Sequence, residues 1–312
     1  MLKKLGCAIA VLSLAIWPSI SFAKDYDLKP SSKWLMDYAP DSCRLMRVFG
    51  EGSDQITAQL IRYQPSDRLE LNLIGKPLAN LLDVSFAEVR FGDTGKFARV
   101  RAFPGGANDS PALFMAVRLD NNPADGTPYE LPLESPRRWV LADGENGQAV
   151  APDLETRIST VTVEVRQRKI VLQLGAMAKP MAALRQCSQD LIQLWGLDPH
   201  QQRTLTRAPQ PIGNPYSWIQ TTYAPDLAFD SERALVHFRL MIDEQGKPTS
   251  CAVQANIEIN QHFSGPGCTA LMKYARFTPA VGPDGKAVAS FYSLRAVWFM
   301  PPTPIEQRLM VR

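Results

Sequence analysis

Four cysteines in the body of the chain, Cys43, Cys187, Cys251 and Cys268, have side chains that form either disulfides or metal–thiolate bonds. A metal site is the less favoured alternative, because the sequence has no C-x-x-C pair and its three histidines are scattered. The even number of these cysteines fits a disulfide framework. Spacing favours a local Cys251–Cys268 bridge, which leaves Cys43–Cys187 to join the ends of a preceding domain. We therefore predict two disulfides, no metal and no cofactor.

Asp93-Thr94-Gly95 matches the core of the motif that carries the catalytic aspartate of aspartic proteases. A single copy is sufficient when two identical chains each supply one aspartate. Gly92 and Lys96, however, stand where that motif has an apolar and a small residue. The Gly-Asp-x-Gly composition predicts a hairpin turn between two strands instead. We expect no enzymatic activity, with an aspartic-type hydrolase as the alternative.

Histidine and glutamate side chains form no catalytic pattern along the sequence. There is no G-x-S-x-G elbow, no P-loop, no G-x-G-x-x-G after a strand and no H-E-x-x-H. His237 falls on the polar face of an alternating strand and His262 in a loop, so we expect both at the surface. Glu70 shares a strand face with Arg68 and Asn72, opposite three leucines, and this alternation predicts a solvated carboxylate.

The first 23 residues, MLKKLGCAIAVLSLAIWPSISFA, have the pattern of a secretory signal. Lys3 and Lys4 precede an apolar stretch, and small residues stand before a cleavage position after Ala23. The stretch is shorter than the roughly 20 apolar residues of a membrane span, so we expect cleavage and export. The alternative is an uncleaved inner-membrane anchor, the only case in which we expect membrane association.

Removal of this segment takes away two lysines and no acid, so 34 − 2 = 32 basic residues balance 31 acidic residues. A net charge near +1 without a Lys/Arg run gives no electrostatic case for nucleic-acid binding. The 312 residues and 45% hydrophobic content predict about two domains, each with its own core.

Residues 24–197 predict a β-rich antiparallel domain, either a sandwich or a barrel, that ends in one helix. Eight short segments rich in β-branched, aromatic or alternating residues are separated by Gly, Pro, Asp and Asn. The helix begins near Pro180, places Cys187 on its apolar stripe and ends at Gly196. This position of Cys187 is compatible with a bridge back to Cys43.

Residues 198–217 contain four prolines and no apolar period, which predicts an extended linker. Residues 218–312 then predict a small domain with the element order β-β-α-β. Cys251 lies on the inward face of the second strand and Cys268 on the inward face of the helix, so their bridge would join helix to sheet. The whole chain is thus expected to be an α+β protein.

The end of this domain carries a motif in which a short helix finishes in R-F-x-P-A and a D-G-K turn leads into a final strand with aromatic residues. Its residues are Arg276, Phe277, Pro279, Ala280, Asp284, Gly285 and Lys286. With the preceding strands, residues 218–305 resemble the C-terminal domain of the TonB energy-transducer family. The similarity extends to exported versions that have one cysteine in the second strand and one in the helix.

This resemblance implies a periplasmic domain of a Gram-negative bacterium that binds an extended peptide of an envelope protein, such as a TonB-dependent outer-membrane transporter. In that mode the peptide adds as a strand to a sheet edge, and backbone pairing supplies the affinity. The implied edge is the last strand, with residues Phe291, Tyr292, Ser293, Leu294, Arg295, Ala296, Val297, Trp298 and Phe299. The alternative is that Phe291, Val297, Trp298 and Phe299 are core residues and the edge is covered.

The chain departs from a transducer in its first two thirds, where a cleavable signal and a β-rich domain replace the anchor and the long spacer. A 20-residue linker reaches only about 60 Å when fully extended. The expected function is therefore a periplasmic TonB-like binding protein. The alternatives are a non-binding structural or assembly protein of the envelope and an exported aspartic-type hydrolase that uses Asp93.

Overall fold

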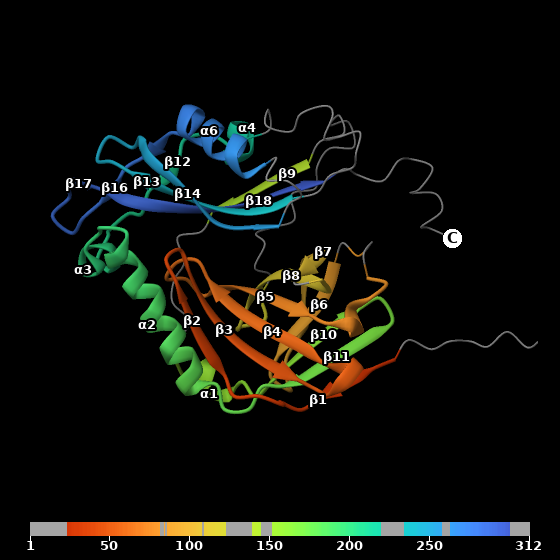
Figure 1. The fold of residues 1–312 in the computed structure, drawn as a ribbon. Coiled ribbons are helices and arrows are strands. Elements are labelled where there is room, and N and C mark those ends of the chain that lie inside the picture. Colours follow the sequence, from red (N-terminus) through yellow and green to blue (C-terminus); the bar gives the residue numbers. More distant parts are fainter. Residues whose placement is uncertain are drawn as a thin grey trace, which may run out of the picture.

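The structure, a computed structural model, describes residues 24–81, 84, 86–107, 109–122, 139–144, 152–219, 234–257 and 263–299 (Figure 1). It is mostly β, with one large curled sheet, a smaller sheet stacked on it, and few helices. Helix α2 (Ala178–Leu194) runs along one side from the larger sheet toward the smaller one. No helix in these ranges has the length and apolar character needed to cross a membrane. The predicted signal lies outside the described residues.

Ten strands form the larger sheet, and all neighbours are antiparallel except β1 and β11. In spatial order they are β1 (Tyr26–Leu28), β11 (Arg168–Gln173), β10 (Thr160–Val165), β6 (Phe86–Phe91), β7 (Ala98–Ala107), β8 (Ser110–Arg118), β5 (Arg68–Ile74), β4 (Ile56–Arg62), β3 (Ser42–Phe49) and β2 (Leu35–Ala39). The sequence predicts a sandwich or a barrel, whereas the structure has one sheet that curls around its own core and stays open between β1 and β2.

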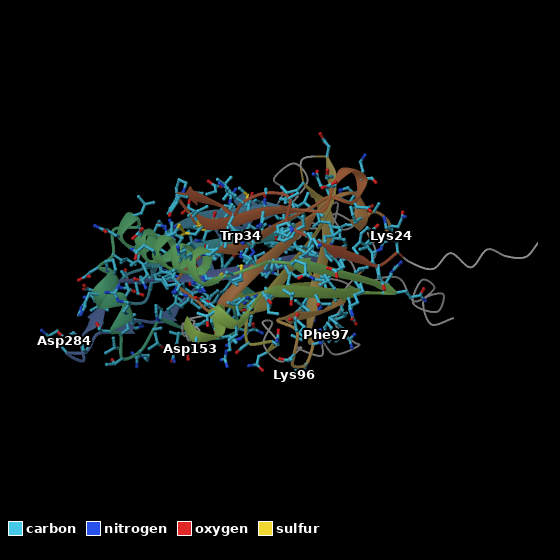
Figure 2. All side chains as sticks on the ribbon, turned by 90° about the horizontal axis from the view of Figure 1, so that it is seen from below. Lys24, Trp34, Lys96, Phe97, Asp153 and Asp284 are labelled. Atoms are coloured by element: carbon cyan, nitrogen blue, oxygen red, sulfur yellow. A yellow bond between two sulfur atoms is a disulfide. The ribbon has the colours of Figure 1, made fainter. Side chains whose placement is uncertain are left out.

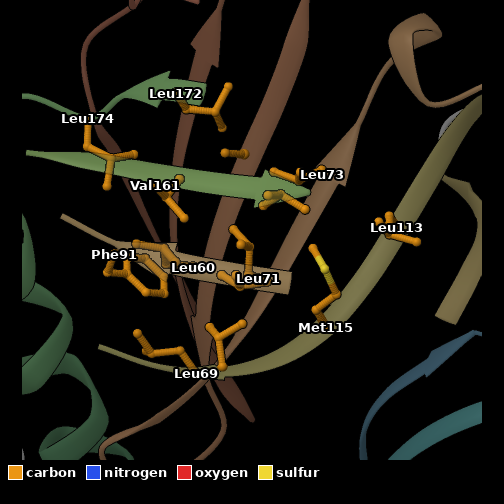
Figure 3. Close-up of a cluster of buried hydrophobic side chains, with 14 of the residues drawn as sticks. Leu60, Leu69, Leu71, Leu73, Phe91, Leu113, Met115, Val161, Leu172 and Leu174 are labelled. Carbon is orange, nitrogen blue, oxygen red and sulfur yellow. The ribbon is translucent and has the colours of Figure 1, made fainter. Parts of the chain in front are cut away.

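The core of this sheet lies inside the curl, where apolar side chains from facing strands meet (Figure 3). Leu69, Leu71 and Leu73 of β5 point into it by the two-residue alternation of a strand, and they meet Phe91 of β6 and Val161 of β10. Burial of each such side chain contributes roughly 1.5 to 3 kcal/mol. Helix α2 closes the core with its apolar stripe, which consists of Met181, Leu184, Cys187 and Leu191.

The predicted Cys43–Cys187 disulfide is present and joins β3 to α2 inside this core.

Three short elements complete this part of the molecule: the 3-10 helices η1 (Gly52–Asp54) and η2 (Lys76–Leu78), and helix α1 (Pro152–Arg157). Lys24, the first described residue, lies at the opposite end of the molecule from Asp284 (Figure 2).

Four strands form the smaller sheet, in the order β14 (Pro248–Ile257), β13 (Ala234–Ile242), β18 (Ser290–Phe299) and β9 (Trp139–Gly144). Helix α6 (Ser264–Tyr274) packs on one face of this sheet, and the predicted Cys251–Cys268 disulfide joins it to β14. Between α6 and β18 the chain forms the two-residue strands β15 (Phe277–Thr278), β16 (Ala280–Val281) and β17 (Ala287–Val288).

The prediction of an extended linker over residues 198–217 is wrong for much of its length. This segment contains helix α3 (Pro199–Arg203), strand β12 (Gln210–Pro211) and the start of helix α4 (Pro215–Ile219). Asp198 caps α3 by accepting a hydrogen bond from the amide of His200 at 2.8 Å. Strand β12 pairs with β15, so the segment packs as part of the C-terminal unit instead of forming an extended connection between two units.

Candidate functional site

The backbone of β18, the predicted edge strand, is paired on both sides over most of its length. Along one side, Ser290 to Trp298 pair with β13. Along the other side, Leu294 to Phe299 pair antiparallel with β9. The expectation of an open edge is therefore wrong for Leu294–Phe299, because a segment from earlier in the same chain already lies there.

The side chains of β18 are buried on both faces of the smaller sheet. Tyr292, Leu294, Ala296 and Trp298 belong to the core that this sheet shares with α6. On the opposite face, Val297 joins the apolar contact with the larger sheet, which consists of Phe103, Ala112, Phe114, Leu235 and Val297. The structure does not describe the side chain of Phe299. Any strand that pairs with β18 is therefore held by backbone hydrogen bonds rather than by exposed side chains of β18 itself.

Glu70 lies between the two sheets, which corrects the expectation that it is solvated. The two-residue alternation correctly placed Glu70 on the face of β5 opposite the three leucines, but that face packs against the smaller sheet. Glu70 is 4% exposed. Its Oε2 lies 3.5 Å from Nε of Arg295 on β18 and 3.5 Å from Nε2 of His237 on β13. One carboxylate of the larger sheet thus faces two basic groups of the smaller sheet.

His237 is also buried, although its position on the polar face of a strand predicted a surface residue. The ring stacks on Tyr63 with a centroid distance of 4.0 Å and an interplanar angle of 24°. We call Tyr63, Glu70, His237 and Arg295 the interdomain charge cluster. The other predicted surface histidine, His262, lies outside the described residues.

The buried position of the interdomain charge cluster shifts the pKa of its members. Burial by itself would raise the pKa of Glu70, but the positive charge of Arg295, together with the polar contact of His237, outweighs burial, so the pKa lies below its ordinary value. Burial lowers the pKa of His237 despite the nearby Glu70. Glu70 is therefore charged and His237 neutral at pH 7, and the cluster contains one carboxylate opposite one guanidinium.

A pH titration should reveal this buried histidine. In the unfolded chain His237 takes up a proton at pH values below its ordinary pKa of 6.5. In the folded protein its pKa is lower, so protonation requires a lower pH. The free energy of unfolding should thus fall as the pH drops from 7.5 to 5.5, because protonation of His237 then stabilises the unfolded chain more than the folded protein.

Replacement of His237 by glutamine should remove this contribution, which urea unfolding at the two pH values would measure. The matched control is His200→Gln, which removes a histidine that is exposed on α3 rather than buried between the two sheets. Equal pH dependence in the wild type and in His237→Gln would contradict the assigned role of His237.

A second group of polar contacts fixes how the two sheets sit on each other. The amide nitrogen of Gln254 on β14 donates to the backbone carbonyls of Asp41 at 3.0 Å and Tyr63 at 2.7 Å. Arg239 on β13 forms an ion pair with Asp41 and lies over the ring of Trp195, 4.2 Å from its centroid. These contacts and the apolar contact around Val297 hold β18 and β9 in a defined place above the larger sheet.

The residues of the predicted family motif are placed around the C-terminal segment rather than along the β18 edge. Phe277 packs edge-on to Trp218 at 5.3 Å and against Tyr292 at 5.0 Å. Ala280 is fully buried in β16, and the turn at Asp284 and Gly285 connects β16 to β17. The segment that carries β12 donates two hydrogen bonds to the motif. The amide of Ile212 donates to the carbonyl of Arg276, and Nη2 of Arg207 donates to the carbonyl of Pro279. In this chain the motif therefore contributes packing.

Asp93 lies in the turn between β6 and β7, as the composition around it predicted. Its Oδ1 accepts a hydrogen bond from the hydroxyl of Thr160 at 2.7 Å, so the carboxylate helps to anchor the turn to β10. Within the described ranges, no three His, Cys, Asp or Glu side chains gather in a way that could hold a metal ion.

The sequence-based reasoning missed β9, the segment that pairs with the predicted edge. Its first residues, Trp139-Val140-Leu141, have high β propensity and could have indicated a strand, but nothing local identifies a partner. Comparisons with protein-family models, curated proteins and solved structures return no match for this chain. What the β18 edge can do must therefore be inferred from its own geometry.

Proposed function

We propose that the protein is an exported, periplasmic binding protein whose C-terminal β-β-α-β unit, similar to the TonB C-terminal domain, takes up an extended peptide of an envelope protein. The peptide adds antiparallel to β18, on the side that β9 occupies in the free chain. The partner class is a segment of an outer-membrane or other envelope protein. The two disulfides support a location outside the reducing cytosol.

The observation that carries this proposal is the pairing of β9 with β18. β9 is separated from the rest of its sheet in the sequence, and it nevertheless pairs with β18 over six consecutive residue pairs. The backbone groups along this edge of β18 thus accept an antiparallel strand that is not its neighbour in the sequence. Because both faces of β18 are buried, pairing depends on backbone groups, and segments of other sequence can satisfy the same groups.

The same observation favours one second candidate, a structural protein in which β9 permanently closes the sheet. A tethered segment has an effective concentration in the millimolar range for its own site. A free peptide of equal intrinsic affinity would displace it only at similar concentrations. The two candidates therefore differ in whether an external strand enters once β9 is removed.

The test weakens β9 without deleting it. Neighbouring residues of a strand point their N–H groups to opposite sides, so proline at both Val140 and Leu141 must remove one N–H that faces β18. A fluorescent peptide with the sequence of residues 137–146 should bind the Val140→Pro/Leu141→Pro variant and should not bind the wild type, as measured by anisotropy. Unlabelled peptides from outer-membrane transporters then compete for the opened edge.

The matched control is Val140→Ala/Leu141→Ala, which keeps both N–H groups and should exclude the peptide as the wild type does. If the proline variant retains its circular dichroism spectrum and both disulfides but does not bind the peptide, strand addition in trans is refuted. The structural candidate would then be favoured. Binding of the 137–146 peptide without competition by any transporter peptide would keep strand addition and reject the transporter as partner.

A further inference from the structure

A cleft of about 590 Å³ lies between the two parts of the molecule, at the end of β18 that β9 does not reach. Its walls come from the turn between β4 and β5, from α2 and α3, from the segment that follows α3, and from the start of β18. Small-molecule sites commonly have volumes of about 300 to 1,000 Å³. Neither the β9 pairing nor the interdomain charge cluster uses these walls.

Arginine dominates the charged lining of this cleft. Of the described residues that line it, four are arginines and none is acidic: Arg62, Arg185, Arg203 and Arg207. Glu155 of α1 lies buried behind the wall and forms ion pairs with Arg185 and with Arg62, the latter at 3.8 Å between Nη2 and Oε1. A second buried carboxylate, Asp67, also attracts Arg62, but it forms its own ion pair with Arg118. The carboxylates near Arg62 are therefore shared with other arginines, and the charged side chains among the described residues that line the cleft itself are all basic.

Arg62 is the innermost of these cations and is only 3% exposed. Among the described residues its Nε has no hydrogen-bond partner. Burial and the neighbouring Arg185 lower the pKa of Arg62 to about 10, although the carboxylate of Asp67 opposes them in part. An anion in the cleft would supply a hydrogen-bond acceptor for this Nε and further negative charge beside the two arginines.

Apolar side chains line the same cleft beside the arginines. Ile192 of α2, Leu205 after α3 and Phe291 of β18 contribute to its walls. An inorganic ion would leave this surface uncovered, whereas a ligand with a hydrocarbon or aromatic portion would bury it. Arg203 and Arg207 are exposed and raise the local concentration of anions at the opening.

From these features we infer that the cleft is a binding site for an amphipathic organic anion. The acidic group, a carboxylate or a phosphate, lies against Arg62 and Arg185, and the apolar portion lies against Ile192, Leu205 and Phe291. The protein would thus hold a small molecule between its two parts, in addition to a strand at the β9 position.

The first experiment uses 8-anilinonaphthalene-1-sulfonate, an aromatic anion whose fluorescence increases in apolar surroundings, with the full chain after residue 23. We expect saturable binding of one dye per chain. Hexanoate and hexyl phosphate should displace the dye, and hexylamine, which has the same apolar chain with a positive charge, should not. The anion that displaces the dye at the lower concentration identifies the preferred acidic group.

Two variants test the arginine wall. Arg62→Gln should raise the dissociation constant of the dye roughly tenfold or more, because it removes a charged donor. Gln189→Glu tests charge alone: Oε1 of Gln189 accepts from Nη1 of Arg203 at 3.2 Å, and glutamate keeps this contact while adding a negative charge to the cleft. We expect several-fold weaker binding for Gln189→Glu.

The matched control is Gln193→Glu, an exposed position on the same helix that does not line the cleft, and its dissociation constant should equal that of the wild type. Equal affinity of Gln189→Glu and Gln193→Glu would overturn the assignment of the site. Displacement of the dye by hexylamine, or no saturable binding at all, would overturn the inference that the cleft selects anions. Failure here leaves the strand-addition proposal intact, since that site is at the other end of β18.

Discussion

Removal of the Cys43–Cys187 disulfide is expected to lower the free energy of unfolding by about 5 kcal/mol, the largest effect of any change considered for this protein. The two cysteines are 144 residues apart in the sequence, and the cost of closing a loop in the unfolded chain rises with the logarithm of its length. Both residues are buried in the core of the larger sheet. Urea unfolding of Cys43→Ala/Cys187→Ala at pH 7.5 would measure the loss.

The matched control for this prediction is the second disulfide. Cys251 and Cys268 are only 17 residues apart, so the same relation gives about 3 kcal/mol for Cys251→Ala/Cys268→Ala. A larger loss for the first pair than for the second supports loop closure as the source of stability. If both double variants lose the same free energy of unfolding, native contacts of the sulfur atoms contribute more to stability than chain entropy does.

Replacement of Glu70 by glutamine should have the next largest effect, a loss of about 3 to 5 kcal/mol in the free energy of unfolding. Glutamine keeps the shape of the side chain but removes the charge that faces Arg295 and His237. The variant therefore leaves a guanidinium in a buried interface without its carboxylate. Chemical unfolding of the full chain would measure the loss. A change in the nuclear magnetic resonance signals of the Tyr63 ring would report the local change.

Glu164→Gln is the matched control for Glu70→Gln, because it makes the same chemical change in the same sheet. Glu164 lies 3.9 Å from Lys169, and both side chains are about half exposed. Ion pairs of this kind contribute roughly 0 to 1 kcal/mol. A loss for Glu70→Gln as small as that for Glu164→Gln would show that the interdomain charge cluster contributes little to the docking of the two sheets.

Local pattern predicted the parts of the fold that depend on neighbours in the sequence. The eight strand segments correspond to β3 to β8, β10 and β11, and the apolar stripe with Cys187 corresponds to α2. The two cysteine pairs follow from spacing and from the inward faces of the elements that carry them. For the strands, for the helix and for the inward faces of the cysteines, the signal comes from a periodicity of 2 or 3.6 residues within one element.

What local pattern could not predict is which surfaces meet. Alternation assigned Glu70 and His237 to polar faces, and polar faces are solvated unless another element covers them. Here the smaller sheet covers the larger one, so both residues are buried. Glu70 and His237 contact each other, and the ring of His237 stacks on Tyr63, which is also far away in the sequence. For the same reason β9 was missed, since its partner strand is defined only by the assembled sheet.

The pairing of β9 with β18 also determines when the smaller sheet can form during synthesis. Gly144 pairs with Leu294, so 294 − 144 = 150 residues must be added to the chain after Gly144 before its pairing partner exists. At about 5 to 20 residues per second this takes roughly 8 to 30 s. Because β18 lies between β13 and β9, the most C-terminal of the described strands is the one that completes the sheet. Until then two nascent strands remain without their central neighbour, and a chain that stops before Ser290 cannot bring them together.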